Sequence, residues 1–164
     1  QNDSCPAPDW NYLHWFGYSN EKHQKIMDGS ALLEYDLGGE NIPMELRIGQ
    51  YQEGGGLAIE LVSWAGREPE DWEALTTNLC VPCERDHAFV NINNPDGKVV
   101  CQWIEKNDLG KATGRQQQSG FCTYPEYHFD AKRLKELDRA GYEKYLTSLQ
   151  QRGRKSKSAG RHGR

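Results

Sequence analysis

The sequence predicts an α+β domain in which a mainly antiparallel sheet of five or six strands packs against two or three helices. Between Leu33 and Leu61, apolar residues alternate with polar ones, the period of two that is typical of half-buried strands. Two later stretches, 98–108 and 130–149, repeat apolar residues at the three-to-four spacing of an amphipathic helix. Glycine, asparagine and proline clusters separate these segments and indicate short turns, which favour antiparallel neighbours.

The first half of the domain is expected to contain one short helix and then strands. Ser19 is a good N-cap residue for a helix that Asp28 and Gly29 end. The triple glycine at 54–56 lacks the lysine and the following helix of a phosphate-binding loop, so we interpret it as a hairpin turn. A charged loop is expected at 67–73. The expected strands are 33–37, 44–48, 57–64, 74–81 and 88–93.

The second half is expected to contain a helix, a loop, a strand and a helix. From Gly110 to Gly120 the only apolar side chain is Ala112, so this segment is predicted to be a loop that crosses the surface. The strand 121–129 contains Pro125, which cannot donate to a ladder and favours an edge strand or an interruption. Asp130 is expected to cap the last helix, which Gly141 weakens locally by roughly 1 kcal/mol relative to alanine.

Length and charge predict a single domain with two extensions. The 164 residues fit one domain, by the usual allowance of roughly 100–200 residues. We expect an aromatic-rich N-terminal segment, residues 1–30, that packs on the domain 31–149, and a disordered basic tail, residues 150–164. No acidic residue follows Glu143, so the net charge of −4 divides into about −10 for the domain and +6 for the tail.

The composition favours a soluble protein without a membrane segment. Hydrophobic residues make up 36% of the chain, and no window approaches the roughly 18 consecutive apolar residues that a membrane helix needs. The first residues show no basic region followed by an apolar run, so no secretory signal is expected.

The cysteines provide one motif with metal-binding or redox chemistry. Cys80 and Cys83 form a C-x-x-C pair, but Cys101 and Cys122 lie twenty residues apart rather than as a second close pair. The pair also lies between two expected strands, whereas a redox C-x-x-C opens a helix. We therefore expect reduced thiols and neither metal nor cofactor, with Cys80 and Cys83 as weak candidate zinc ligands.

Motifs for catalysis are absent from the sequence. The five histidines form no H-x-x-x-H pair, and no serine lies in a G-x-S-x-G elbow. Cys122, His128 and Asp130 can be arranged as a triad on paper, but triads depend on geometry rather than on closeness in sequence. The sequence leaves enzymatic activity open and favours a non-enzymatic domain.

Two sets of residues are candidate binding groups. The segment 110–120 is rich in hydrogen-bond donors and has no carboxylate, within a domain that is otherwise acidic. Its side chains could instead only satisfy their own backbone. With one neighbouring tyrosine, the candidate binding residues are Lys111, Thr113, Arg115, Gln116, Gln118, Ser119 and Tyr124. The candidate polyanion-binding residues of the tail are Arg152, Arg154, Lys155, Lys157, Arg161 and Arg164.

Several motifs resemble those of a small domain family of unknown function from conjugative and other mobile elements of gut Firmicutes and related bacteria. They include L-x-Y-D-L-G at 33–38 and E-L-R-I-G-x-Y at 45–51. The most specific block is W-I-E-K-N-D-L-G-K-A-T-G-R followed by S-G-F-C-T-Y-P-E-Y-H-F-D, which ends at Asp130. The resemblance covers about residues 31–130. It implies a bacterial, cytoplasmic, mobile-element protein and implies no activity.

Three functions remain open at this point. The first is a non-enzymatic accessory domain that binds an unknown protein partner through the segment 110–120. The second is a nucleic-acid-associated protein that uses its basic tail for weak binding. The third is an acidic mimic of DNA that inhibits a DNA-binding enzyme, although the acidic residues are interspersed with lysines and arginines.

Overall fold

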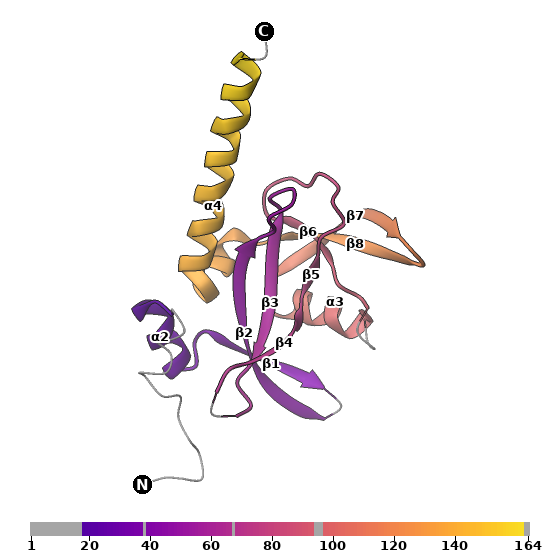
Figure 1. The fold of residues 1–164 in the computed structure, drawn as a ribbon. Helices are drawn as coiled ribbons and strands as arrows, with labels where there is room; N and C mark the ends of the chain where they lie inside the picture. The colour runs from indigo at the N-terminus through magenta and orange to yellow at the C-terminus, as the bar shows by residue number, and fades with distance from the viewer. Residues whose placement is uncertain (1–17, 38, 67, 94–96, 163–164) are drawn as a thin grey trace.

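The computed structural model describes residues 18–37, 39–66, 68–93 and 97–162. These residues form three helices and eight strands, which confirms the predicted α+β class (Figure 1). The strands divide between two antiparallel sheets of four strands each, so the expected single sheet of five or six strands does not match the structure. Residues 1–17, which hold most of the aromatic N-terminal segment, lie outside the described residues.

The first sheet has the order β1-β2-β3-β4, and its strands are Leu32–Leu37, Glu40–Gln50, Leu57–Ser63 and Glu70–Ala74. Leu46 faces Leu61 and Ile48 faces Ile59 across β2 and β3, and all four side chains are buried. The alternating pattern therefore predicted these strands correctly. It missed β4, which was expected to be a charged loop, because this edge strand buries little of its surface and shows no alternation.

The second sheet has the order β5-β6-β8-β7, and its strands, in chain order, are Thr76–Thr77, His87–Val90, Gly110–Ser119 and Cys122–Phe129. The chain passes from the first sheet to the second at the buried residue Leu75. The Leu75 N–H donates to the Ile59 carbonyl at 2.8 Å, and the Leu75 carbonyl accepts from the Asn91 N–H at 2.9 Å. This corner shortens the strand expected at 74–81 to two residues.

The segment 110–120 is a strand and a turn rather than the predicted surface loop. In β7, Gly110 lies opposite Phe129 and Ser119 lies opposite Cys122, with a register shift between Ala112 and Gln116. Pro125 lies within β8, which has β6 on one side and β7 on the other. β8 is therefore not an edge strand. The other predicted alternative, an interruption, is confirmed, because Pro125 pairs with Gln116 where the register between β7 and β8 resumes after its shift.

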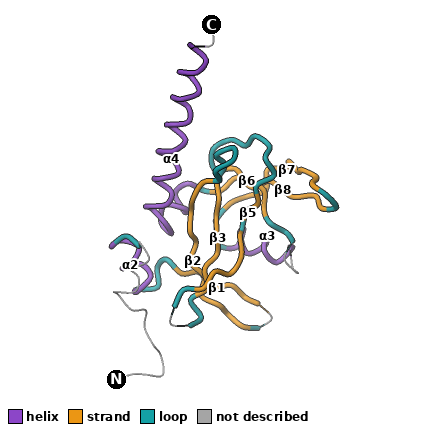
Figure 2. The backbone as a smooth tube through the Cα atoms, in the orientation of Figure 1, coloured by secondary structure: helices purple, strands orange, loops and turns teal. Residues whose placement is uncertain are grey.

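The helices are α2 (Asn20–Met27), α3 (Gly97–Lys106) and α4 (Ala131–His162). Leu134, Leu137 and Tyr142 of α4 join Met44 and Leu46 in the main core, so this helix covers β2. The predicted helix ended at 149, whereas α4 continues to His162, and its last part extends away from the sheets (Figure 2). The expected disorder of residues 150–164 stays a prediction for measurement in solution. Among the described residues, no helix has the length and apolarity needed to cross a membrane.

Candidate functional site

Four of the predicted binding residues lie together along the exposed strand β7. The side chains of Lys111, Gln116, Gln118 and Ser119 are all exposed to solvent. The strand ends at a turn in which Gly120 has a φ of 64° and Phe121 is fully exposed. Figure 1 shows that β7 and β8 form a ribbon that projects from the second sheet. The result is a polar edge strand with an apolar side chain at its tip.

Thr113 and Arg115 are also exposed on β7, and in addition each contacts a buried carboxylate. Both lie in the register shift of β7 and both contact Glu126 of β8, whose side chain is only 4% exposed. The Thr113 hydroxyl donates to Glu126 Oε1 at 2.8 Å, and Arg115 Nη1 lies 2.9 Å from Glu126 Oε2. These contacts offset the free-energy cost of burying the Glu126 carboxylate. The two side chains therefore hold β7 and β8 together.

Tyr124 is also turned toward the protein. It is 7% exposed, and its hydroxyl accepts a hydrogen bond of 2.8 Å from Asn93 Nδ2. A buried tyrosine with a satisfied hydroxyl contributes to packing. Tyr124 is therefore not available as a contact on the outer surface of the ribbon.

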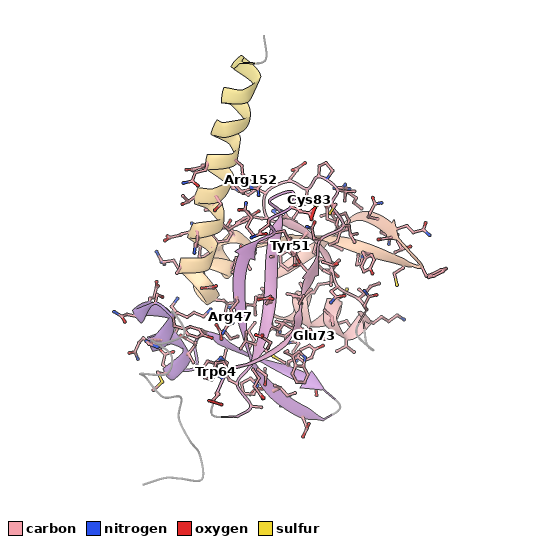
Figure 3. The ribbon with its side chains drawn as sticks, viewed as in Figure 1. Arg47, Tyr51, Trp64, Glu73, Cys83 and Arg152 are labelled. Atoms are coloured by element: carbon pink, nitrogen blue, oxygen red, sulfur yellow. The ribbon has the colours of Figure 1, made fainter. Side chains whose placement is uncertain are left out.

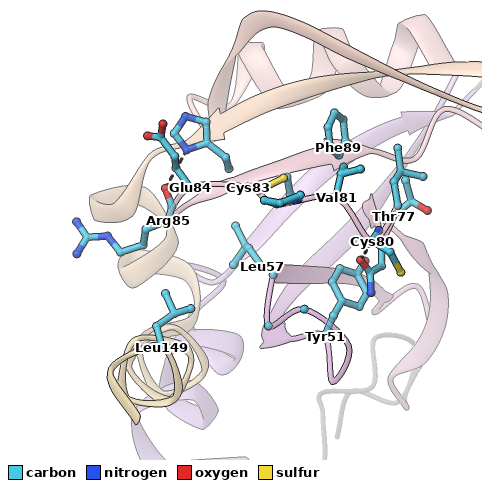
Figure 4. A pocket seen from close by; sticks show the side chains of 18 of the residues that line it. Tyr51, Leu57, Thr77, Cys80, Val81, Cys83, Glu84, Arg85, Phe89 and Leu149 are labelled. Carbon is cyan, nitrogen blue, oxygen red and sulfur yellow. Dashed lines mark hydrogen bonds between the residues drawn. The ribbon is translucent and has the colours of Figure 1, made fainter. Parts of the chain in front are cut away.

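A cavity of about 330 Å³ lies between the β2–β3 hairpin, the segment 77–85 and α4 (Figures 3 and 4). The hairpin contributes Tyr51 and Leu57, and α4 contributes Tyr145 and Leu149. Figure 4 shows Val81 and Phe89 on the side opposite the hairpin. Sequence reasoning missed this site because its walls come from three segments that are distant in the chain.

The wall formed by residues 80–86 is held at several points. Arg115 Nη1 donates to the Pro82 carbonyl at 3.2 Å. At Asp86, the N–H donates to the Tyr145 hydroxyl at 3.1 Å, and the carboxylate accepts from the Tyr142 hydroxyl at 2.7 Å. Cys80 and Asp86 have φ values of 58° and 67°, in the left-handed region that non-glycine residues rarely occupy. The wall therefore keeps an unusual backbone conformation through contacts with β7 and α4.

The cysteines do not gather into a metal centre in the part of the chain that the structure describes. Within that part, no three His, Cys, Asp or Glu side chains are placed to hold a metal ion. Cys80 is exposed and Cys83 is half-buried. Burial, with a contribution from the Glu126 carboxylate, raises the pKa of the Cys83 thiol, which favours its protonated form. The absence of zinc stays an expectation that elemental analysis can test.

The triad that can be drawn on paper does not form. Cys122 and His128 lie at opposite ends of β8, and six residues of extended chain span roughly 20 Å. The Cys122 thiol instead donates to Asn93 Oδ1 at 3.4 Å. The His128 ring stacks on the His87 ring, with their centroids 4.3 Å apart.

A buried group of charges was not anticipated from the sequence. Lys22 of α2 is 6% exposed, and its Nζ lies 3.2 Å from Glu45 Oε2 and 3.4 Å from Asp138 Oδ1. Glu45 Oε1 also accepts hydrogen bonds of 2.8 Å from Tyr18 and from Trp64. Glu45 faces away from the main core in β2, so the alternating pattern predicts an exposed residue. Its burial comes from α2 together with the packing of Tyr18 and Trp64.

The predicted tail residues differ in what the structure describes of them. Arg152 Nη2 donates to the Gln52 carbonyl at 2.7 Å, which attaches α4 to the β2–β3 hairpin (Figure 3). Its guanidinium lies so close to Gly55 that a Cβ there would be 2.8 Å from Arg152 Nε. Arg154, Lys155, Lys157 and Arg161 lie on α4 with side chains that are not described, and Arg164 lies outside the described residues.

Comparison with known proteins identifies one domain family. A family model described as a domain of unknown function, DUF4313, matches residues 45–149. No curated protein and no solved structure matches the chain. The matched residues include β7, β8, the cavity and most of the core.

Proposed function

We propose that this chain, which belongs to the DUF4313 family, is a non-enzymatic domain that binds a partner protein through β7. The observation that carries the proposal is the open edge of this ten-residue strand. β7 is the last strand of its sheet, so no strand of the described residues pairs with its outer side. The backbone N–H and C=O groups along that side are available to an extended segment of another protein.

Several properties of the β7–β8 ribbon favour pairing of a partner's extended segment with the edge of β7. Protein edge strands are often protected by proline, by lysine or by a covering helix. Residues 116–119 have neither proline nor lysine, and their side chains are polar and mostly exposed. Phe121, at the end of the ribbon, adds an apolar anchor beside this edge. Backbone pairing would supply affinity, and Phe121 with Lys111 would supply selectivity.

A displayed library of random peptides tests this function. Peptides selected on the intact protein should shift the backbone NMR signals of residues 110–121. Adding lysines with Gln116→Lys and Gln118→Lys should weaken their binding at least tenfold, because lysines on an edge oppose pairing. Gln24→Lys, on the exposed side of α2, is the matched control and should leave binding unchanged. Selected peptides that shift other regions, or that bind the double variant equally well, would contradict the proposal.

The biological setting is proposed from the resemblance of residues 31–130 to a family of mobile-element proteins. We place the protein in the bacterial cytoplasm as an accessory protein of a conjugative or related element. The family model overlaps most of the residues that carry this resemblance. Inspection of the genes beside members of the family tests the setting, and a consistent absence of transfer genes would contradict it.

Weak polyanion binding by the tail is a second candidate function. It is supported by the charge division between an acidic domain and a basic C-terminal segment. Figure 1 shows α4 carrying this segment away from the sheets, where a nucleic acid could reach it. Binding of this kind would show no preference for base sequence.

A further inference from the structure

We infer that the cavity between the β2–β3 hairpin, the segment 77–85 and α4 is a binding site for a neutral, flat aromatic small molecule of two rings. This inference does not depend on the proposed function, because the cavity and the outer edge of β7 are different surfaces. It rests on the chemistry of the lining, on the rigidity of the walls and on the volume.

The lining of the cavity is more apolar than polar. The half-buried side chains of Tyr51, Val81 and Leu149 present ring and hydrocarbon surface to it (Figure 4), whereas Leu57, Phe89 and Tyr145, which also line it, are almost fully buried. The charged lining residues Glu84 and Arg85 are exposed to solvent. A ligand that enters this interior loses water without gaining an internal ion pair, which disfavours a charged molecule. Aromatic side chains favour a flat ring that can lie against them.

The polar groups of the lining are mostly engaged within the protein. The Tyr51 hydroxyl lies 2.8 Å from Thr76 Oγ1, and the Asn78 side chain bonds the Glu53 carbonyl and the Cys80 N–H. His87 Nδ1 lies 2.9 Å from the Arg85 carbonyl, which can only accept. Nδ1 is therefore the donor in the neutral ring, and Nε2 remains as an acceptor. A ligand with few polar groups is therefore complementary to such a lining.

The walls are fixed before any ligand arrives. The backbone at Cys80 and Asp86 occupies the left-handed region at both ends of one wall, and bonds from Arg115, Tyr142 and Tyr145 hold that wall. Strained backbone that its surroundings maintain is frequent at ligand sites. On the opposite wall, Arg152 and Asn78 hold the hairpin carbonyls of Gln52 and Glu53. A preformed site of this kind loses little conformational freedom on binding.

The volume of the cavity limits the size of the ligand that it can hold. The cavity measures about 330 Å³, within the lower part of the usual range for small-molecule sites. A dry cavity of about 150 Å³ in another protein accepts benzene. Twice that volume accommodates a fused pair of rings, so indole is a suitable probe.

Titration of the full-length protein with indole, followed by backbone NMR, tests the inference. Saturable shifts are expected in the segments 54–57, 78–86 and 145–149. The structure also offers a filling variant: Gly56 has no positive φ, and a Cβ there would meet only Tyr51, at 3.9 Å. Gly56→Leu should therefore fold and should weaken indole binding at least tenfold. Gly66→Leu is the matched control, because a Cβ at Gly66 meets nothing within 4 Å and the residue is exposed.

Three outcomes would overturn the inference. They are the absence of saturable shifts up to the solubility of indole, shifts located outside the cavity walls, and equal affinity in Gly56→Leu and in the unchanged protein. Should Gly56→Leu not fold, Leu149→Trp fills the same cavity from α4 and should reduce binding in the same way. Indole-3-acetate, which adds a negative charge, should bind more weakly than indole. Peptide binding at β7 is read from different signals, so either proposal can fail while the other holds.

Discussion

Glu126 links the predicted binding strand to the cavity wall. Its buried carboxylate receives Thr113 and Arg115 from β7, and Arg115 also bonds the carbonyl of Pro82. Arg115 thus contacts both the β7–β8 ribbon and the wall of the cavity. The sequence predicted that Arg115 contacts a partner, which is still to be tested, and the structure adds an ion pair between this partly exposed side chain and the buried Glu126.

The variants Arg115→Ala and Lys111→Ala should distinguish a side chain that forms an internal ion pair from one that is only exposed on β7. Arg115→Ala leaves the Glu126 carboxylate without its cation and should destabilise the protein by about 1–2 kcal/mol, a value reduced by the partial exposure of Arg115. Lys111→Ala changes an exposed side chain and should stay within about 0.5 kcal/mol. Urea unfolding measures both. Equal, negligible losses would show that the Arg115–Glu126 pair contributes no stability.

Removal of the buried ammonium of Lys22 should be far more costly. Lys22→Met removes the cation nearest to the buried carboxylates of Glu45 and Asp138 and leaves only Arg47, 3.7 Å from Glu45; breaking such a buried pair costs about 3–5 kcal/mol. The double variant Lys22→Met/Glu45→Gln should recover part of this loss. Lys144→Met, at an exposed lysine of α4, is the control and should stay within about 0.5 kcal/mol. If Lys22→Met unfolds at the same urea concentration as the control, the charge group does not stabilise the fold.

Several tyrosines should make the protein sensitive to alkali. Burial raises the pKa of Tyr18, Tyr127 and Tyr142. Each tyrosine hydroxyl also donates a hydrogen bond to a carboxylate, and these carboxylates, of Glu45, Glu105 and Asp86, raise the pKa further. An unfolded tyrosine has a pKa of about 10, so the stability from these groups is complete below that pH and is lost as the pH rises above it. Absorbance of tyrosinate and circular dichroism, followed together above pH 9, should change in one cooperative step. Smooth titration of every tyrosine before unfolding would contradict this expectation.

Among the elements, α4 differs most from its sequence pattern. Its buried residues on both sides of Asp138 suggest one continuous helix, yet Asp138 has φ −152° and ψ 74°. Its carboxylate accepts from the Ile48 N–H at 2.9 Å and from the Gly141 N–H at 3.3 Å. Asp138 therefore acts as the N-cap of a second helical segment and fixes this segment to β2.

Gly141 is required where α4 is interrupted at Asp138, and it does not simply weaken the helix. In a regular helix Gly141→Ala would add about 1 kcal/mol of stability. Here the new Cβ would lie 2.5 Å from the Ile48 carbonyl oxygen and would also overlap the Asp138 carboxylate. We therefore expect Gly141→Ala to destabilise the protein by about 1–3 kcal/mol. Thermal unfolding of Gly141→Ala beside Ala140→Gly, an exposed neighbour, tests this. A gain of stability in Gly141→Ala would contradict the close approach of α4 to β2.

At the scale of the molecule, the division of charge predicts how any polyanion binds. Arg152 is held by the Gln52 carbonyl, which leaves at most five basic residues of the tail for phosphates. The logarithm of the affinity for duplex DNA should then fall with the logarithm of the salt concentration with a slope no steeper than about −4.5. Fluorescence anisotropy of labelled DNA measures this slope. A chain that ends at Arg152 keeps the contact with the hairpin and should lose the binding. Binding that survives this truncation would place the site on the folded domain.

The sequence by itself determined the α+β class, the strands β1 to β3 and the positions of the three helices. These elements bury a face whose period is visible along the chain, as in Leu46 and Ile48 or in Trp103 and Ile104. It also indicated most of the exposed residues of β7 as candidate binding groups, which is still to be tested.

Only the tertiary structure decided that β7 is a strand, that the strands form two sheets and that Glu45 and Glu126 are buried. β7 is held by backbone pairing with β8 and buries no apolar face. Its sequence therefore shows no hydrophobic period. The corner at Leu75 depends on hydrogen bonds to Ile59 and Asn91, and the cavity depends on three distant segments. Each of these features results from contacts between residues far apart in the chain, whereas periodicity reports only on neighbours.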